Sequence, residues 1–325
     1  EPWFMKSLGD RMWASGVNRF IFHRYAHQPW TDLRPGMTMA RWGMWFEWPI
    51  TWWNEAQAWT AYLSRGQYLL QAGRNVADAL LFVGDNSPND IVGRGSLPAG
   101  YEYDCADALT LTRLTVENGE LVLPHGNRYR LLVLPNSTTM LPQTVLQVQR
   151  LLEAGATVVG PQPRRSPSLA PGSDAALTAV GAAVWAGIDE ETTQRAVGAG
   201  RLYDWQPLDT VLDELGLAPD LTLTGPEAAT VDWLHRTTPE AEIYFLASRA
   251  DEPHTVTALF RQTGRRPELW HADSGLTELA PLWREVGGLT EVTLNFDGRG
   301  SHFVVFPTAA PDAALVSWAS VERTG

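Results

Sequence analysis

The stretch Val76-Ala-Asp-Ala-Leu-Leu-Phe-Val83, followed by Gly84-Asp85-Asn86-Ser87-Pro88, decides the fold class of the middle of this chain. A nearly continuous apolar run of this length, closed by a turn sequence, is typical of a parallel strand buried on both faces of a sheet. Two similar runs follow, Arg130–Pro135 and Ala156–Gly160. We therefore expect three strands of one parallel sheet in this region.

Segments with helical character lie around these strands. We expect helices over Asp104–Leu114, from Pro142 to Gly155 and over Ala175–Trp185, and a hairpin that turns at Asn118-Gly119. Alternating strands and helices predict that residues 74–205 form an open α/β domain of amidotransferase-like shape with a mainly parallel sheet. Its ligand-facing loops are expected at the carboxyl ends of the strands.

Residues 1–73 have the pattern of the last units of a (β/α)8 barrel. A helical pattern runs from Phe4 to Met12, and Val17–Phe22 then predicts a short strand. After a long loop, Thr51 is expected to cap a helix that ends at Gly73. Because the chain opens on a helix, with neither Met nor a signal peptide, we interpret it as a fragment entered midway through an α/β repeat.

In residues 206–325 the pattern of apolar residues changes to a period of two. From about Thr230 onward, short runs such as Glu242–Leu246, Thr255–Phe260 and Ser301–Phe306 alternate with turn signals. Short strands in this arrangement predict a β-rich, sandwich-like domain.

Composition excludes several kinds of partner. The 325 residues contain 25 Lys and Arg against 37 Asp and Glu, and the resulting charge of −12 would repel phosphate backbones, so no nucleic acid partner is expected. Apolar runs far below about 18 residues exclude a membrane-spanning segment. The one cysteine, Cys105, rules out an internal disulfide and, placed at an expected helix start, is not a candidate nucleophile. The compartment stays undecided; a periplasmic or secreted full-length protein is compatible with this composition.

Tryptophan is concentrated near the N-terminus, where nine of the 15 lie before residue 60. Two interpretations stay open for those in the loop of residues 24–50. They pack in the core, or they stack against sugar rings, whose C–H bonds face the aromatic π cloud. Trp30 and Trp42 are the candidates for sugar stacking.

Three polar side chains follow the expected first strand. In a barrel, the carboxyl end of a strand faces the active-site mouth, so His23, His27 and Gln28 are candidate ligands for sugar hydroxyls. The alternative is that both histidines are structural, bonded to loop carbonyls or buried in the core. Because the His-x-x-x-His spacing holds a metal on a helix and this stretch ends at Pro29, we expect no metal site at these two histidines. We also expect no cofactor in this chain.

Two carboxylates are candidate catalytic groups. Glycoside hydrolysis needs two carboxyl groups on either side of the scissile bond. Glu47 stands in Trp45-Phe46-Glu47-Trp48, where aromatic burial is expected to raise its pKa toward the range of a general acid. Asp85 follows the strand Val76–Val83, and the alternative for Asp85 is a loop cap that bonds nearby amides.

Beyond these single residues, an ordered set of short motifs resembles glycoside hydrolase family 106, the α-L-rhamnosidases. In residues 1–73 the motifs are Gly16–His23, His27-Gln-Pro29, Pro35-Gly36, Thr51-Trp-Trp53, Trp59–Arg65 and Leu69–Gly73. In the rest of the chain they are Val76–Asp85, Leu97–Asp104, Tyr129–Pro135, Gly155–Pro161, Arg165–Leu169, His235-Arg236 and Ile243–Phe245. The resemblance covers nearly the whole chain.

The resemblance implies a (β/α)8 catalytic barrel that acts on terminal α-L-rhamnose in plant or pectic glycans. It also implies inversion at the anomeric carbon, two catalytic glutamates and a calcium ion in the full-length protein. Asp85 departs from the glutamate that the family has at this position. Since the chain matches only the last barrel units, the main catalytic glutamates and the calcium ligands are expected upstream of Glu1.

The sequence therefore predicts the C-terminal part of an enzyme that resembles inverting α-L-rhamnosidases, with a rhamnose-containing glycan as its partner. The alternative is a noncatalytic carbohydrate-binding or scaffold fragment. Under either hypothesis the isolated chain is not expected to be an active enzyme.

Overall fold

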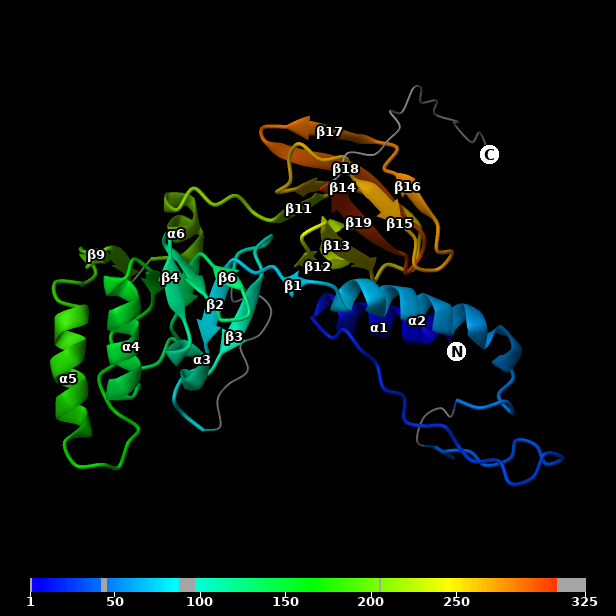
Figure 1. The fold of residues 1–325 in the computed structure, drawn as a ribbon, viewed down its shortest axis with the longest axis horizontal. Helices are drawn as coiled ribbons and strands as arrows, with labels where there is room; N and C mark the ends of the chain where they lie inside the picture. Colours follow the sequence, from blue (N-terminus) through cyan, green and yellow to red (C-terminus); the bar gives the residue numbers. More distant parts are fainter. Residues whose placement is uncertain (1, 42–45, 88–96, 205, 309–325) are drawn as a thin grey trace. The chain divides into compact units, whose positions relative to one another are not determined.

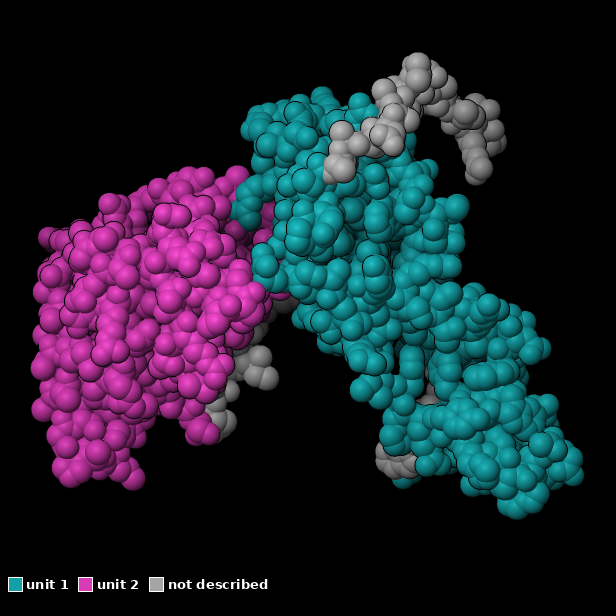
Figure 2. Space-filling view, in the orientation of Figure 1, with its two compact units in different colours: residues 1–74, 223–325 teal, residues 75–222 magenta. Residues whose placement is uncertain are grey.

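The computed structural model describes residues 2–41, 46–87, 97–204 and 206–308. The chain forms two compact units (Figure 2): unit 1 combines residues 1–74 and 223–325, and unit 2 is residues 75–222. The N-terminal and C-terminal thirds, which the sequence separates, thus belong to one unit.

Unit 2 is built on a six-stranded sheet in the order β3-β2-β7-β8-β10-β9 (Figure 1). The strands are β2 Ala79–Phe82, β3 Tyr103–Ala106, β7 Leu131–Val133, β8 Thr157–Val159, β9 Gln194–Val197 and β10 Gly200–Tyr203. Every neighbouring pair is parallel except β9 and β10. The expected open, mainly parallel sheet is confirmed.

Helices and a small sheet complete unit 2. They are α3 Ala108–Thr112, α4 Pro142–Glu153, α5 Ser173–Val184, α6 Leu208–Glu214, and the strands β4 Thr115–Glu117, β5 Glu120–Val122 and β6 Arg128–Tyr129. One apolar core includes Leu80 and Leu132, and a second includes their strand neighbours Leu81 and Leu131. Alternate residues of each strand therefore enter different cores, which explains the continuous apolar runs in the sequence.

One expected helix of unit 2 is partly wrong. The segment predicted to be helical from Asp104 begins instead as the edge strand β3, whose partner is β2, and the helix starts at Ala108. Asp107 caps this helix by accepting a hydrogen bond from the Thr110 N–H at 2.7 Å. Cys105 lies in the edge strand and is exposed.

The β-rich part of unit 1 has two sheets. The first has the order β1-β12-β13-β19-β15-β16, and the second β11-β14-β18-β17. Their bounds are β1 Arg74–Asn75, β11 Leu221–Thr224, β12 Val231–Thr237, β13 Ala241–Ser248, β14 His254–Phe260, β15 Glu268–Trp270, β16 Thr277–Leu279, β17 Trp283–Val286, β18 Leu289–Phe296 and β19 Ser301–Pro307, with a 3-10 turn η2 at Ala228–Thr230. Tyr244, Phe260 and Phe306 from the two sheets meet edge to face, so the sheets share a core, as the period of two predicts.

The helices α1 (Pro2–Ala14) and α2 (Ala56–Gln71) pack on the first of these sheets. Trp13 is fully buried, with its ring 5.6 Å from that of Phe245 on β13 and 5.3 Å from that of Tyr62 on α2. Gly66 is required here, because a Cβ at this position would lie 2.4 Å from the Trp13 ring. Part of the tryptophan cluster is therefore core.

Two expectations for residues 1–73 are corrected. Val17–Phe22 forms no strand; in the described part of the chain no neighbouring strand is there to accept its backbone hydrogen bonds, and Ile21 is 90% exposed. Thr51 does not cap a helix, since a 3-10 turn, η1 (Trp53–Glu55), comes before α2 and Glu55 occupies the cap position.

Candidate functional site

Glu47, in unit 1, carries a buried carboxylate that is not fully hydrogen-bonded. It is only 4% exposed; its Oε1 accepts a hydrogen bond from the Trp48 N–H at 2.9 Å, and its buried Oε2 has no hydrogen-bond partner among the described residues. A hydrogen bond from the Tyr25 hydroxyl to this carboxylate, together with the negative charge of Glu47, raises the pKa of Tyr25. Burying a polar oxygen without a hydrogen bond is costly, so such an oxygen marks a candidate functional group.

Aromatic rings build the surroundings of Glu47. The ring of its neighbour Phe46 lies 4.8 Å from that of Phe22 and 5.4 Å from that of Trp52. The Phe46 N–H donates to the Arg24 carbonyl at 2.9 Å, which joins the two ends of the long loop. The residue before Glu47 is therefore held in place by contacts with other aromatic rings.

The next residue along the chain, Trp48, lines a cleft of about 740 Å³. Its lining residues are Arg34, Pro35, Trp48, Pro49, Ile50, Thr51, Trp53 and Asn54. The guanidinium of Arg34 lies 4.3 Å from the centre of the Trp48 ring. This volume lies within the range of about 300–1,000 Å³ that small-ligand sites have.

Gln28 holds the loop segment that follows Arg34. Its side-chain amide donates to the Met37 carbonyl and accepts from the Met37 N–H, both at 2.8 Å. Gly36 has a φ of 73°, and a Cβ there would lie 2.2 Å from the Gln28 Oε1. Both functions of the carboxamide are therefore occupied by the segment that carries Arg34, and Gln28 acts here as a loop clamp.

The other predicted sugar ligands lie apart from this lining. His23, His27 and Trp30 are exposed on the same long loop and are not among the residues that line the cleft. Trp42 lies outside the described residues. A sugar-binding role for these four residues stays a prediction.

Asp85 belongs to unit 2, where it holds the start of α4. Its Oδ2 accepts a hydrogen bond from the Leu141 N–H at 2.8 Å, and its Oδ1 accepts one from the Thr144 hydroxyl at 2.9 Å. Leu141 has no side chain that could cap the helix, so Asp85 supplies the cap from 56 residues earlier. These contacts favour the interpretation of Asp85 as a loop cap.

We expect Asp85→Ala to lower the free energy of unfolding of the chain by about 1–2 kcal/mol, because the first turn of α4 loses its cap. Urea unfolding followed by circular dichroism measures this change, and Asp213→Ala, which removes an exposed aspartate of α6, is the control. An unchanged unfolding curve together with lost activity in the full-length enzyme would restore the catalytic interpretation of Asp85.

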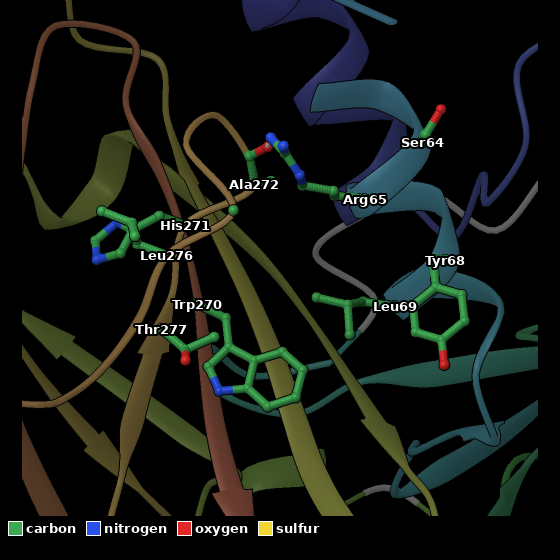
Figure 3. Close-up of a pocket in the computed structure, with 10 residues that line it drawn as sticks. Ser64, Arg65, Tyr68, Leu69, Trp270, His271, Ala272, Leu276 and Thr277 are labelled. Carbon is green, nitrogen blue, oxygen red and sulfur yellow. Dashed lines mark hydrogen bonds between the residues drawn. The ribbon is translucent and has the colours of Figure 1, made fainter. Parts of the chain in front are cut away.

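A second cleft of unit 1 lies between α2 and the strands β15 and β16 (Figure 3). Its volume is about 440 Å³, and in Figure 3 Trp270 and Tyr68 lie on either side of Leu69. No carboxylate is among the described residues that line this cleft, so these residues do not supply the groups that glycosidic bond hydrolysis requires.

Within the described residues, no group of three or more His, Cys, Asp or Glu side chains could hold a metal ion. The described residues therefore do not fit the calcium site that the family resemblance implies. No described helix has the length and apolar character to cross a bilayer.

The model of the α-L-rhamnosidase family, glycoside hydrolase family 106, matches residues 1–282 of the chain. The chain belongs to glycoside hydrolase family 106. The resemblance deduced from the motifs is thereby confirmed.

Two relatives are similar to this chain over nearly its full length. The structure of a rhamnosidase from Novosphingobium sp. PP1Y superposes with a TM-score of 0.88 at 32% identity, over 98% of this chain and 31% of that one. A protein of Formosa agariphila named putative beta-glucuronidase is 34% identical over 99% of this chain and 27% of its own length. The chain thus spans less than a third of either relative.

Proposed function

We propose that this chain is the C-terminal part of a longer α-L-rhamnosidase that takes part in polysaccharide degradation. Residues 1–73 form the last units of its (β/α)8 barrel, and the chain supplies part of the sugar-binding wall. Membership of family 106 and the fraction of each relative that the chain spans support this proposal.

One observation carries the proposal: Glu47, a buried carboxylate whose Oε2 has no hydrogen-bond partner among the described residues, directly precedes Trp48 in the sequence. Trp48 and Trp53 line the cleft, whereas Glu47 itself is not among the lining residues. Indole rings such as those of Trp48 and Trp53 offer flat apolar faces to sugar C–H bonds. Inversion requires a general acid and a general base about 6.5–9.5 Å apart. In our proposal Glu47 takes part in proton transfer at the bound sugar, and the upstream barrel strands supply the principal catalytic glutamates.

A second candidate activity comes from the name of the F. agariphila relative. A β-glucuronidase binds a sugar carboxylate, and Arg34 in the cleft wall offers a cation for that group. Assaying the full-length protein on aryl α-L-rhamnoside and aryl β-D-glucuronide separates the two. Our proposal expects turnover of the rhamnoside; turnover of the glucuronide alone would replace it with the second activity, and binding of glycans without turnover of any glycoside would favour the noncatalytic alternative.

His27→Ala in the full-length enzyme should lower kcat/KM on the rhamnoside on the order of tenfold or more, because hydrogen bonds to substrate hydroxyls are lost. His27 is exposed, so the melting temperature should stay nearly unchanged. Steady-state kinetics and thermal unfolding measure both effects, with the exposed His125→Ala as control. A lower melting temperature with unchanged activity per folded molecule would show that His27 is structural.

A further inference from the structure

Arg34, in the wall of the cleft, has no acidic partner among the described residues. Other arginines of this acidic chain are paired: Arg128 bonds Glu117 and Glu120, Arg284 bonds Glu291, and Arg299 bonds Asp251. For Arg34, the described residues provide the ring of Trp48 at 4.3 Å and no carboxylate at ion-pair distance. Its charge is therefore available to a ligand of the cleft.

The position of Arg34 is fixed by the loop that carries it. Gln28 holds both backbone groups of Met37, and the close approach of Gly36 to Gln28 leaves no room for a side chain. Pro35 restricts the backbone directly after Arg34. Because the segment is fixed before a ligand arrives, less conformational entropy is lost on binding.

The position of the Arg34 guanidinium over the Trp48 ring also suits its chemistry. A guanidinium is planar and can contact an aromatic ring with its face, while its N–H donors form a fork that matches two oxygens of one anionic group. Thr51 and Asn54 in the same lining offer donors and acceptors for ring hydroxyls, and Trp53 offers an aromatic face. The lining thus combines features for an anion and for a sugar ring.

We propose that this cleft binds an anionic sugar, with a uronate carboxylate or a sulfate ester at Arg34, and that Arg34 determines this specificity. The inference deepens the proposed function, on which it rests for the class of ligand. In a rhamnosidase, such a sugar would be a neighbour of the rhamnose in the glycan. The rhamnose itself is neutral and would not bind Arg34.

Direct binding to the 325-residue chain tests the inference without turnover. The probes are trigalacturonate and its methyl ester, which differ in charge but not in sugar, and D-galactose 6-sulfate with D-galactose as the second pair. By calorimetry we expect one charged probe to bind about tenfold to a hundredfold more tightly than its neutral counterpart, as charge-assisted hydrogen bonds would give. The pair that shows this difference identifies the carboxylate or the sulfate as the natural group.

Arg34→Gln should abolish that difference, and Arg34→Lys should keep only part of it. Arg11→Gln removes the same charge from the exposed end of α1, outside the cleft, and should keep the difference in full. Equal affinities of the wild-type chain for charged and neutral probes, no binding of any probe, or an unchanged difference in Arg34→Gln would overturn the inference. Because the readout is binding, these results do not depend on whether the full-length protein hydrolyses rhamnosides.

Discussion

Glu47→Gln is expected to lower kcat/KM of the full-length enzyme on an aryl α-L-rhamnoside by about a hundredfold or more, the effect of removing a carboxyl group that transfers a proton. The variant should be at least as stable as the wild type, because a buried carboxyl group with one unpartnered oxygen is replaced by an amide of the same shape. Steady-state kinetics and urea unfolding measure the two effects separately.

Glu55→Gln is the matched control for this substitution. Glu55 is an exposed acid eight positions later, at the start of α2, so its replacement should change neither quantity. If Glu47→Gln unfolds more readily and keeps its activity per folded molecule, the carboxylate is structural and the candidate site is wrong.

The 325-residue chain by itself should release no measurable rhamnose from the same substrate. Hydrolysis with inversion needs two carboxyl groups, and of the two candidates in the chain Asp85 is bonded to the start of α4 in unit 2. Losing the second catalytic group costs most of the rate acceleration, which for glycosidases is many orders of magnitude.

This experiment needs proof that the isolated chain is folded, which cooperative thermal unfolding provides. Turnover by the pure chain that disappears in Glu47→Gln would show that both acids are present in these residues. Turnover by the isolated chain that persists in Glu47→Gln would show that the chain is active and that Glu47 is not one of its catalytic acids.

Much of the fold could be predicted from local patterns. The run Val76–Val83 is apolar throughout because alternate residues of β2 enter two cores, and Asn118-Gly119 turns a hairpin because both residues take a positive φ, 54° and 84°. The edge strand β3 could not be recognised in this way. Its four residues are polar or small and run directly into a helix, so they resemble the first turn of that helix.

The candidate site was harder to predict. Glu47 is recognisable from its aromatic neighbours in sequence, whereas Arg34 meets Trp48 only after the long loop folds. The role of Asp85 depends on contacts 56 and 59 residues away. Gln28 has a suitable side chain for sugar hydroxyls, but its partner Met37 carries no sequence signal. An arginine followed by Pro-Gly in a tryptophan-rich loop was the one available hint of the cleft.

The central claim, that the chain completes an inverting α-L-rhamnosidase, is tested most directly by the first sugar that the full-length protein releases. Proton NMR recorded during hydrolysis of an aryl α-L-rhamnoside distinguishes the two anomers before they interconvert. We expect β-L-rhamnose as the first product, because inversion places water on the opposite face of the ring. Initial release of α-L-rhamnose, or no release of rhamnose at all, would contradict it.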